Sequence, residues 1–479
     1  MEMNRRTLLK SALVGGAIAG TAGLAACSTN GSQANASASA SLPATTVGDN
    51  EVTPLQLFAS PDFNGQALFA LGGVSVRTAE VGEVMRITQT INSTTGNPAS
   101  PGTDAFDAFY DGFGQYSDQL DQLAGQSGTA HPVSTRNRYF RSAMYNAQQV
   151  FFVLGTSDGN REQQIFQTCQ SRWQQAIALM QPSVISAKVA SKFGQIPVYF
   201  FPAPGSGDKP TVIISEGSDG QNVETMQFGV IDGLQRGYNV VLFEGPGQMS
   251  LLFNQNIPFT PDWNDVVGPV LSWTRKQKNV GKVGLVGISF GGMLCARAAA
   301  KLKLDAVVLE PGAYDMPALW ADQENMKTVQ ETYNLPAAQK QNVAQQVNEG
   351  FVKSWPGLTR SEQFEIYKRG EIFSPQVQKD ARAGVAPSNY YGLLEALIPF
   401  NYEADYGQIK IPTMVTTNQG DQFFAEQGAH AFELLTQVPA NQKKLLDLTA
   451  AMGASMHDQP TGTQVAQEYI YDWLDGFLR

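Results

Sequence analysis

Short apolar runs separated by helix-length segments dominate the chain from residue 184 onward, and few folds accommodate such a pattern. The runs expected to be strands are Ile196–Phe201, Thr211–Ser215, Asn239–Phe243, Val283–Val286, Ala306–Leu309, Thr413–Thr416 and Lys444–Leu448. The middle runs are continuous rather than alternating, as in strands covered on both faces. With helical stretches between most of them, the pattern predicts an α/β protein with a mainly parallel sheet and right-handed crossovers.

Two long segments lack this strand rhythm and are expected to be helical. The first carries apolar residues at three- and four-residue spacings from Ser134 to Leu154, and a second helix follows to Met180. The other segment separates Leu309 from Thr413 and is too long for a loop, so we interpret it as an inserted helical cap. The predicted division is a helical N-terminal domain over 51–183, a core over 184–315 and 409–479, and a cap over 316–408.

The first 27 residues resemble an export signal. Paired arginines, Arg5 and Arg6, precede a weakly apolar stretch rich in Gly and Ala, which is typical of the twin-arginine route. The stretch ends in Leu24-Ala25-Ala26-Cys27, which resembles the lipobox of bacterial lipoproteins, although an ordinary cleavage site with an incidental Cys27 is the alternative. Residues 28–50 are rich in small polar residues and predict a flexible linker. We therefore expect an extracytoplasmic protein, with membrane attachment if Cys27 is lipidated.

Composition excludes several classes of function. The formal net charge is −10, and no Lys/Arg cluster occurs beyond the N-terminal signal, so nucleic acid is not expected as a partner. Cys169 and Cys295 lie in helical patterns and are expected to be small buried hydrophobic residues rather than a disulfide. Three scattered histidines provide no ligand set for a metal, and no cofactor is predicted. Oligomerisation remains open.

The candidate nucleophile is Ser289. The run Val283–Val286 leads directly into Gly287-Ile288-Ser289-Phe290-Gly291-Gly292, and a helical stretch from Met293 to Lys301 follows. This is a G-x-S-x-G motif between a strand and a helix, the context in which the serine of a nucleophile elbow is found. The glycines let the chain turn sharply, and the helix N-terminus favours negative charge beside the serine. The alternative is a serine in a tight structural turn.

A serine hydroxyl needs a base, and histidine is the usual one. His457 lies in a glycine-containing loop after the last predicted strand, where this class of fold carries its functional residues. His131 is in an Ala-His-Pro-Val turn of the N-terminal region, and His430 is inside the helical stretch 425–435, where a capping or partly buried role is expected. The predicted base is His457.

The candidate acid is Asp421. It follows the strand Thr413–Thr416 and precedes His457 by 36 residues, which gives the chain order Ser, Asp, His. A carboxylate there would fix the tautomer of the imidazole and stabilise the imidazolium. Its alternative role is the N-cap of a helix beginning near Ala425, and Asp315 is the substitute acid.

An oxyanion hole requires two N–H donors. The backbone of Phe290, directly after the nucleophile, is one candidate. The other should come from the turn Glu216–Gly220, and Ser218 is the residue predicted to supply it.

The stretch Gly237–Gln248 resembles the R-G-Y-x-V-L-x-F-D-G-P-G-Q-G sequence of a group of bacterial and fungal α/β-hydrolases. That group includes the fermentation-respiration switch protein, 2,6-dihydroxypseudooxynicotine hydrolase and fungal polyketide-shortening hydrolases. Further matching stretches are Pro258–Trp263, Gly287–Gly292, Glu310–Asp315, Asp421–Phe424 and Tyr471–Leu474.

The resemblance implies an α/β-hydrolase fold in which the helical N-terminal domain and the cap cover the active site. It also implies a triad at Ser289, Asp421 and His457, and cleavage of esters or of carbon–carbon bonds beside a ketone. Two departures from the group pattern lie near the expected pocket. Glu216 stands where Gly or His is usual, and Met249 replaces the last glycine of Gly-Pro-Gly-Gln-Gly.

These patterns favour hydrolysis of an acyl, ester-type bond in a small molecule through an acyl-enzyme on Ser289. One alternative is a carbon–carbon bond hydrolase acting on a β-diketone or aryl ketone. Another is a catalytically idle lipoprotein that binds ligands at the cell surface.

Overall fold

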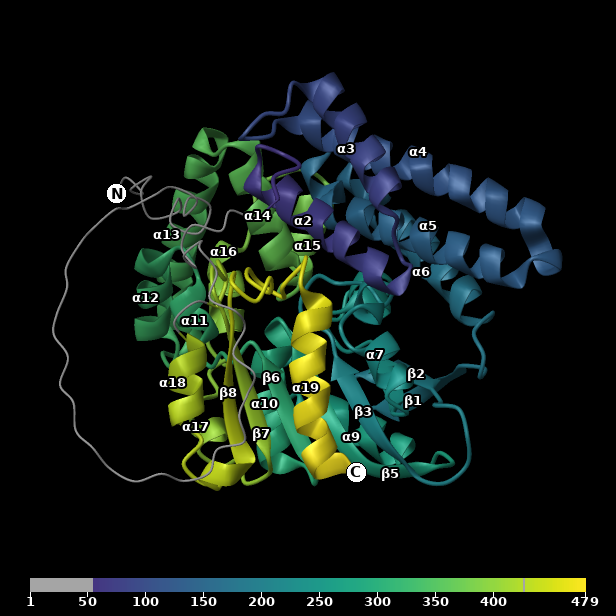
Figure 1. The fold of residues 1–479 in the computed structure, drawn as a ribbon. Helices are drawn as coiled ribbons and strands as arrows, with labels where there is room; N and C mark the ends of the chain where they lie inside the picture. The colour runs from purple at the N-terminus through teal and green to yellow at the C-terminus, as the bar shows by residue number, and fades with distance from the viewer. Residues whose placement is uncertain (1–54, 425–426) are drawn as a thin grey trace, which may run out of the picture.

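A computed structural model describes residues 55–424 and 427–479 (Figure 1). The expected export signal, its Cys27 and the linker lie outside the described residues. One sheet organises the chain after residue 184, in the order β1-β2-β4-β3-β5-β6-β7-β8. Its strands are β1 (Ile185–Ser191), β2 (Gly194–Phe201), β3 (Lys209–Ser215), β4 (Asn239–Phe243), β5 (Val280–Ile288), β6 (Ala306–Glu310), β7 (Thr413–Asn418) and β8 (Lys443–Leu448).

The strands from β3 to β8 pair in parallel, whereas β1 and β2 are antiparallel. The predicted α/β class with a mainly parallel sheet is confirmed. β4 and β6 are buried along their whole length, in keeping with their continuous apolar sequences. β1 was not predicted, because as an edge strand it buries Val189 and leaves most of its other side chains in contact with solvent.

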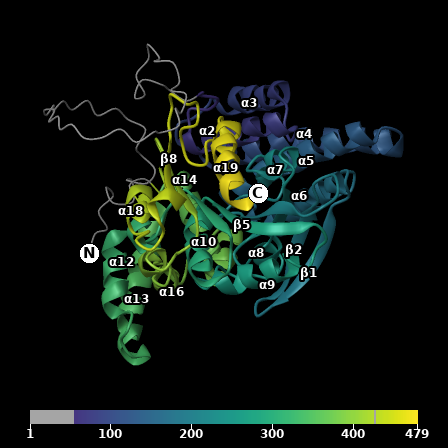
Figure 2. The same ribbon diagram turned by 60° about the horizontal axis from the view of Figure 1, so that its bottom comes forward.

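Helices cover both faces of the sheet. α10 contacts β5 and β6, with α9 beside it, while α19 packs against β5 and β6 from the other face with α7 (Figures 1 and 2). These core helices are α7 (Val230–Gln235), α8 (Met249–Phe253), α9 (Asn264–Thr274), α10 (Phe290–Lys301), α18 (Gln427–Glu433) and α19 (Thr463–Leu478). The described fold is that of an α/β-hydrolase.

The N-terminal region is a helical bundle above the sheet (Figure 1). Aromatic rings form its centre, with the Phe63 ring 4.7 Å from Phe109 and 4.9 Å from Phe152. Trp173 packs edge-on against Tyr199 of β2 at 4.6 Å and so joins the bundle to the sheet. Its helices are α2 (Pro61–Gly72), α3 (Val81–Thr95), α4 (Thr103–Ser127), α5 (Pro132–Phe152) and α6 (Glu162–Ile177).

The segment between β6 and β7 is also helical. Its helices are α11 (Met316–Leu319), α12 (Gln323–Thr332), α13 (Ala337–Ser354), α14 (Arg360–Glu371), α15 (Pro375–Arg382), α16 (Tyr390–Leu397) and α17 (Glu403–Tyr406). Thr359 and Glu362 form a capping box at the start of α14, which satisfies N–H groups of its first turn.

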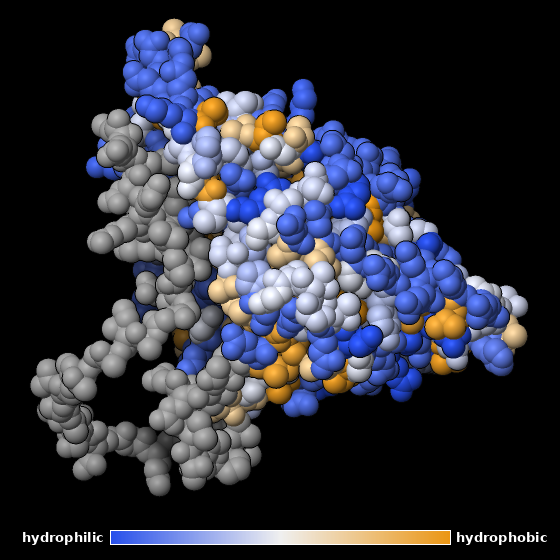
Figure 3. All heavy atoms as spheres, turned by 90° about the horizontal axis from the view of Figure 1, so that it is seen from above, coloured by the Kyte–Doolittle hydropathy of each residue, from blue (hydrophilic) through white to orange (hydrophobic). Residues whose placement is uncertain are grey.

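The cap and the N-terminal helices join into one roof over the sheet. Arg360 of α14 donates hydrogen bonds to the carbonyl oxygens of Leu154, Gly155 and Thr156 at 2.8–2.9 Å. Arg382 pairs with the buried Glu162 at 2.7 Å. On the face seen from above, the coloured atoms are mostly hydrophilic, with several hydrophobic groups among them (Figure 3). Within residues 55–424 and 427–479, no helix combines the length and apolarity that crossing a bilayer requires.

Candidate active site

Ser289 occupies a sharp turn between β5 and α10. Its backbone has φ 54° and ψ −127°, a combination that is rare for a residue with a side chain and strained. The N–H of Ser289 donates to the carbonyl oxygen of Glu310 at 2.7 Å, which fixes the turn to the end of β6. A Cβ added to Gly287 would lie 2.2 Å from the carbonyl oxygen of Gly291, so the turn requires glycine there.

Three side chains from distant parts of the sequence meet at this turn. The Ser289 Oγ lies 2.9 Å from His457 Nε2, and His457 Nδ1 lies 3.0 Å from Asp421 Oδ2. Ser289 follows β5, Asp421 follows β7 and His457 follows β8, so all three are at the carboxyl end of the sheet. The hydroxyl, imidazole and carboxylate therefore form one continuous chain of contacts.

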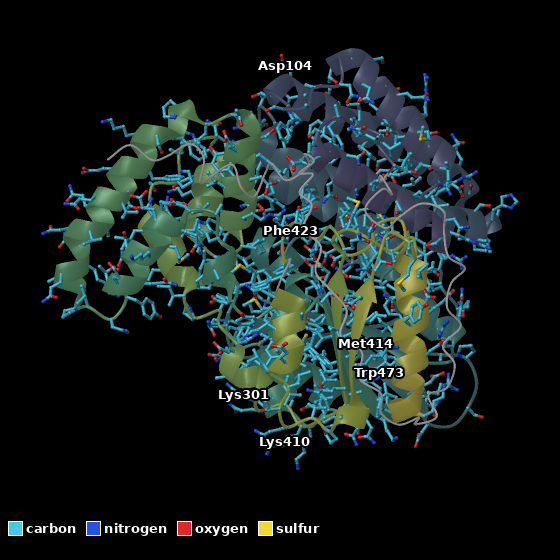
Figure 4. All side chains as sticks on the ribbon, turned by 60° about the vertical axis from the view of Figure 1, so that its left-hand side comes forward. Asp104, Lys301, Lys410, Met414, Phe423 and Trp473 are labelled. Atoms are coloured by element: carbon cyan, nitrogen blue, oxygen red, sulfur yellow. The ribbon has the colours of Figure 1, made fainter. Side chains whose placement is uncertain are left out.

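Asp421 is held by its own turn. Its carboxylate accepts hydrogen bonds from the backbone N–H groups of Phe423 at 2.8 Å and Phe424 at 3.0 Å. Burial acts to raise the pKa of Asp421, but His457 and these N–H groups outweigh it, so that the pKa is lowered from its usual value. The rings of Phe423 and Phe424 pack against the imidazole at 4.9 and 5.4 Å. In Figure 4, Phe423 lies where the strands, the cap and the N-terminal helices meet.

The other candidates from the sequence lie elsewhere. The carboxylate of Asp315 accepts the N–H of Ala318 and caps α11. His131 precedes the first turn of α5 and is exposed, and His430 on α18 faces Glu433 at 3.5 Å. Of the two candidate acids, Asp421 and Asp315, Asp421 is the one whose carboxylate contacts His457.

The turn after β3 approaches the serine through Gly217. A Cβ added to Gly217 would lie 2.6 Å from the Cβ of Ser289 and 3.0 Å from the backbone nitrogen of Phe290. Ser218, the residue expected to supply an oxyanion donor, directs its hydroxyl at Asp219 at 2.9 Å. The donor roles of Ser218 and Phe290 stay predictions, since the structure establishes only that this turn and the Phe290 nitrogen are adjacent to the nucleophile.

Gln248, from the Gly-Pro-Gly-Gln sequence, holds this turn in place. Its Nε2 donates to the carbonyl oxygen of Gly217 at 2.8 Å, and its Oε1 accepts the N–H of Gly245 at 2.9 Å. Trp263, from another of the matching stretches, donates to Ser215 Oγ at the end of β3 at 3.0 Å. These two motif residues thus support the approach of the turn to Ser289 rather than the chemistry itself.

A second carboxylate beside the base was missed in the sequence. Asp458 Oδ2 lies 3.2 Å from His457 Nε2, on the same side of the ring as Ser289. The side chain is buried, and its Oδ1 has no hydrogen-bond partner among the described residues. The only signal in the sequence is that Asp458 directly follows the predicted base, which by itself does not show where its side chain points.

The electrostatics of the site are unusual. Burial acts to lower the pKa of His457, but Asp458 and Asp421 outweigh it and raise the pKa to about 9. Burial raises the pKa of Asp458 to about 7, an effect that His457 partly opposes. Burial, followed by the charge of Asp458, raises the pKa of Glu310 to about 8, and burial raises that of Glu216 well above its usual range. The site therefore concentrates carboxyl groups around one imidazole.

Arg369 of the cap brings a positive charge to this region. Its guanidinium pairs with Asp219 in the turn after β3 and lies over the ring of Phe423, 4.8 Å from the centroid. The roof therefore contacts both the turn that approaches Ser289 and an aromatic ring that packs on His457.

No group of three or more metal-ligating side chains is assembled within the described part of the chain. Cys169 and Cys295 are both buried and form no disulfide with each other, in agreement with their predicted role as small hydrophobic residues. The chemistry that the described site offers is that of a hydroxyl activated by an imidazole and carboxylates.

Comparison with known proteins places the chain in a family. The model of the family described as X-Pro dipeptidyl-peptidase (S15 family) matches residues 216–459, about half of the chain. The α/β-hydrolase psoB of Aspergillus fumigatus is 25% identical over 278 residues, which cover 54% of this chain and 60% of psoB. The 20-hydroxy-prefusarin hydrolase FUS2 of Gibberella moniliformis is 23% identical over 88% of this chain and 97% of its own.

The crystal structure of 2,6-dihydroxy-pseudo-oxynicotine hydrolase has the same fold. It superposes with a TM-score of 0.59 at 16% sequence identity, covering 85% of this chain and 95% of the other. Together with the described sheet, these similarities confirm the expected subfamily. The chain belongs to the X-Pro dipeptidyl-peptidase (S15) family and is a hydrolase of the α/β-hydrolase fold, related to the fungal hydrolases psoB and FUS2.

Proposed function

We propose that the protein is an exported serine hydrolase that cleaves an acyl, ester-type bond of a small molecule. The observation that supports this most directly is the contact chain from the Ser289 hydroxyl through His457 to Asp421, with both distances within 3.0 Å. A hydroxyl in that chain can be deprotonated as it attacks a carbonyl carbon.

In the proposed reaction, His457 Nε2 takes the proton of Ser289 Oγ as the oxygen attacks the acyl carbon. Asp421 stabilises the imidazolium, and N–H groups at the start of α10 and in the turn 216–220 stabilise the oxyanion. The imidazolium then protonates the leaving group, which leaves an acyl-enzyme. Water, deprotonated by His457, releases the acid and restores the serine.

A small molecule is the proposed substrate because the site lies under the roof. Arg369 of the cap contacts the turn beside the nucleophile, so the cap lies close to Ser289. The names of two similar proteins, 20-hydroxy-prefusarin hydrolase and 2,6-dihydroxy-pseudo-oxynicotine hydrolase, also denote small-molecule substrates.

The test is covalent labelling with a fluorophosphonate probe at about pH 10, above the pKa of about 9 of His457, where most of the imidazole is neutral. Wild type and Ser93→Ala, which alters an exposed serine of α3, should be labelled. Ser289→Ala should not be labelled and should not turn over p-nitrophenyl esters. Labelling that persists in Ser289→Ala would contradict the proposal by placing the nucleophile elsewhere. A folded wild type that resists the probe would contradict it in favour of an idle binding protein.

Peptide cleavage is the second candidate, because the matching family model is described by a dipeptidyl-peptidase activity. A panel of p-nitrophenyl esters, lactones and X-Pro p-nitroanilides distinguishes the two by kcat/KM. The panel should include a β-diketone and an aryl ketone, since the same triad can serve carbon–carbon hydrolysis. The bond class with the highest Ser289-dependent kcat/KM identifies the reaction.

We also propose export by the twin-arginine route and lipidation at Cys27, on the basis of the sequence of residues 1–27. Replacing Arg5 and Arg6 together by lysine should leave the protein in the cytoplasm. Cys27→Ser should shift it from the membrane fraction to the soluble extracytoplasmic fraction. A Cys27→Ser protein that stays with the membrane would contradict the lipid anchor.

A further inference from the structure

The imidazole of His457 lies between two carboxyl groups. Asp421 Oδ2 is 3.0 Å from Nδ1, and Asp458 Oδ2 is 3.2 Å from Nε2. In the proposed reaction Asp421 stabilises the imidazolium, while Asp458 has no assigned role.

We propose that Asp458 is a positioning residue that acts through His457, as a second carboxylate that stabilises the imidazolium from the side of the nucleophile and makes the base stronger. This inference rests on the proposed function, because it concerns the base that activates Ser289. It adds a residue to the machinery that the triad pattern does not contain.

The backbone around Asp458 holds its side chain in this position. Asp458 has φ 53°, and its neighbours Met456 and Gln459 have φ 73° and 45°, so the loop combines three left-handed residues that carry side chains. The side-chain amide of Gln459 donates to Asn418 Oδ1 at 2.9 Å, which ties the loop to the end of β7. A strained loop held in this way indicates that the direction of the carboxyl is determined by the fold.

Besides the imidazole, the carboxyl has one further contact, at the nucleophile itself: the backbone N–H of Ser289 donates a hydrogen bond to it, which favours its ionised form. Asp458 is 6% exposed, and its Oδ1 has no hydrogen-bond partner in the part of the chain that the structure describes. A buried carboxylate that only stabilised the fold would be expected to have its oxygens satisfied by donors. Its closest charged neighbour is instead the ring of the base.

The charged groups around His457 and Asp458 come from several elements. Asp421 follows β7, Glu310 ends β6, Glu216 and Asp219 follow β3, and Arg369 comes from the cap. Arg369 acts to lower the pKa of His457, but Asp458 and Asp421 outweigh both it and burial and raise the pKa to about 9. Burial raises the pKa of Glu216, and it raises the pKa of Glu310 to about 8, so Glu310 is largely protonated at pH 7 and contributes little charge there. Burial raises the pKa of Asp458 only to about 7, against the opposing effect of His457, so a large share of Asp458 is ionised at neutral pH.

Two opposite effects on catalysis follow. A second carboxylate stabilises the imidazolium that forms when the proton moves from Ser289 Oγ to Nε2, which favours the transition state. It also keeps the ring protonated in the resting enzyme at neutral pH, which leaves less free base. Asp458 therefore lowers activity at neutral pH, where the ring is protonated, and raises activity at alkaline pH, where the free imidazole is a stronger base.

The test is Asp458→Asn, which removes the charge and keeps the shape. Asparagine tolerates left-handed backbone, so the strained loop is preserved. The control is Asp232→Asn, which removes another buried carboxylate, hydrogen-bonded to Gln464 on α19, away from the base. Two quantities are measured against pH: the rate of fluorophosphonate labelling of Ser289, and the imidazole NMR signals of ¹³C-histidine protein, whose three histidines are assigned by single substitution.

In Asp458→Asn, we expect the His457 titration and the acidic limb of the labelling rate to move about 1–3 pH units lower, with a lower plateau at alkaline pH. Asp232→Asn should match wild type in both. An unshifted His457 titration, or a variant whose labelling is lost at every pH while it remains folded, would overturn the inference. If wild type resists the probe altogether, the proposed function fails, yet the NMR titration still decides whether Asp458 controls the base.

Discussion

Asp421 illustrates how a single residue is prepared for its part in the site. Two backbone N–H groups of its own turn donate to Oδ1, while Oδ2 faces His457 Nδ1. These contacts lower the pKa of Asp421 from its usual value despite its burial, so the carboxylate stays ionised over the working pH range. A negative charge fixed in direction is what an imidazole needs in order to present Nε2 to the serine.

Asp421→Asn should therefore lower kcat/KM for p-nitrophenyl esters by about 10⁴-fold, because an amide stabilises the wrong tautomer of His457. Asp315→Asn is the matched control: this carboxylate caps α11 and should leave kcat/KM near wild type. Should Asp315→Asn carry the large loss instead, the acid would have been assigned to the wrong residue.

The pKa of His457 predicts an alkaline pH profile. The neighbouring carboxylates raise this pKa to about 9, so the ring is protonated at pH 7 and the base is unavailable in most molecules. We expect kcat/KM for an ester to rise with pH and to level off above about pH 9. A profile that is already flat from pH 7 upward would show that the base titrates near its ordinary value.

The sequence predicted Ser289, His457 and Asp421, because each follows a recognisable strand and the three occur in a known order. It did not predict the positions of Asp458 and Gly217. The direction of the Asp458 side chain depends on left-handed backbone in the loop 456–459, and three non-glycine residues there carry no local signal for that conformation. The contact of Gly217 with Ser289 depends on the register between β3 and β5, which a single sequence does not specify.

At the scale of elements, the end of β3 and the end of β5 approach one another more closely than ordinary side chains allow. The pairing of Ser215 with Gly287 sets Gly217 against the nucleophile turn, and Gly291 faces the carbonyl oxygen of Ser215. Gln248 and Trp263 fix the end of β3 by hydrogen bonds to Gly217 and Ser215. The strands that carry these residues were predicted because their buried runs are continuous, whereas β1 was missed because its exposed edge gives only a weak apolar pattern.

Gly217→Ala should lower kcat/KM by about 10²-fold, since the new methyl group would lie 2.6 Å from the Ser289 Cβ and must displace the turn or the serine. Gly82→Ala, on the open surface of α3, has nothing within 4 Å of the added Cβ and should leave kcat/KM unchanged. Circular dichroism and Tm should show that both variants fold. Full activity of a folded Gly217→Ala would mean that the turn is not held against the serine.

At the scale of the whole molecule, the roof consists of two segments that are far apart in sequence. Arg360 donates a hydrogen bond to the carbonyl oxygen of Gly155, which lies 205 residues earlier in the sequence. The ring of Phe364 packs against Phe106 and Phe152, each at 5.1 Å between ring centroids. The helical character of the N-terminal segment was predicted from its periodicity, and that of the cap from a length too great for a loop. The contact between the two segments was not predicted from periodicity. Arg360 donates to backbone carbonyl oxygens, and a backbone partner leaves no complementary charge in the sequence that would identify it.

Arg360→Ala should destabilise this union, because it leaves the buried carbonyl oxygens of Leu154, Gly155 and Thr156 without their donor. The expected cost is about 1–3 kcal/mol, which should lower Tm by a few degrees. Lys353→Ala removes an exposed cation at the end of α13 and should leave Tm unchanged. Equal Tm values for Arg360→Ala and wild type, measured by differential scanning calorimetry, would show that the two segments are held together by other contacts.

The ion pair between Arg369 and Asp219 connects the cap to the turn beside the nucleophile. Asp219 belongs to the turn that touches Ser289, while Arg369 belongs to the roof, so any motion that lifts the roof from the sheet must separate the two. The same contact that fixes the cap over this edge of the sheet therefore also supports the turn beside the nucleophile. Roof and nucleophile turn thus share one charged support.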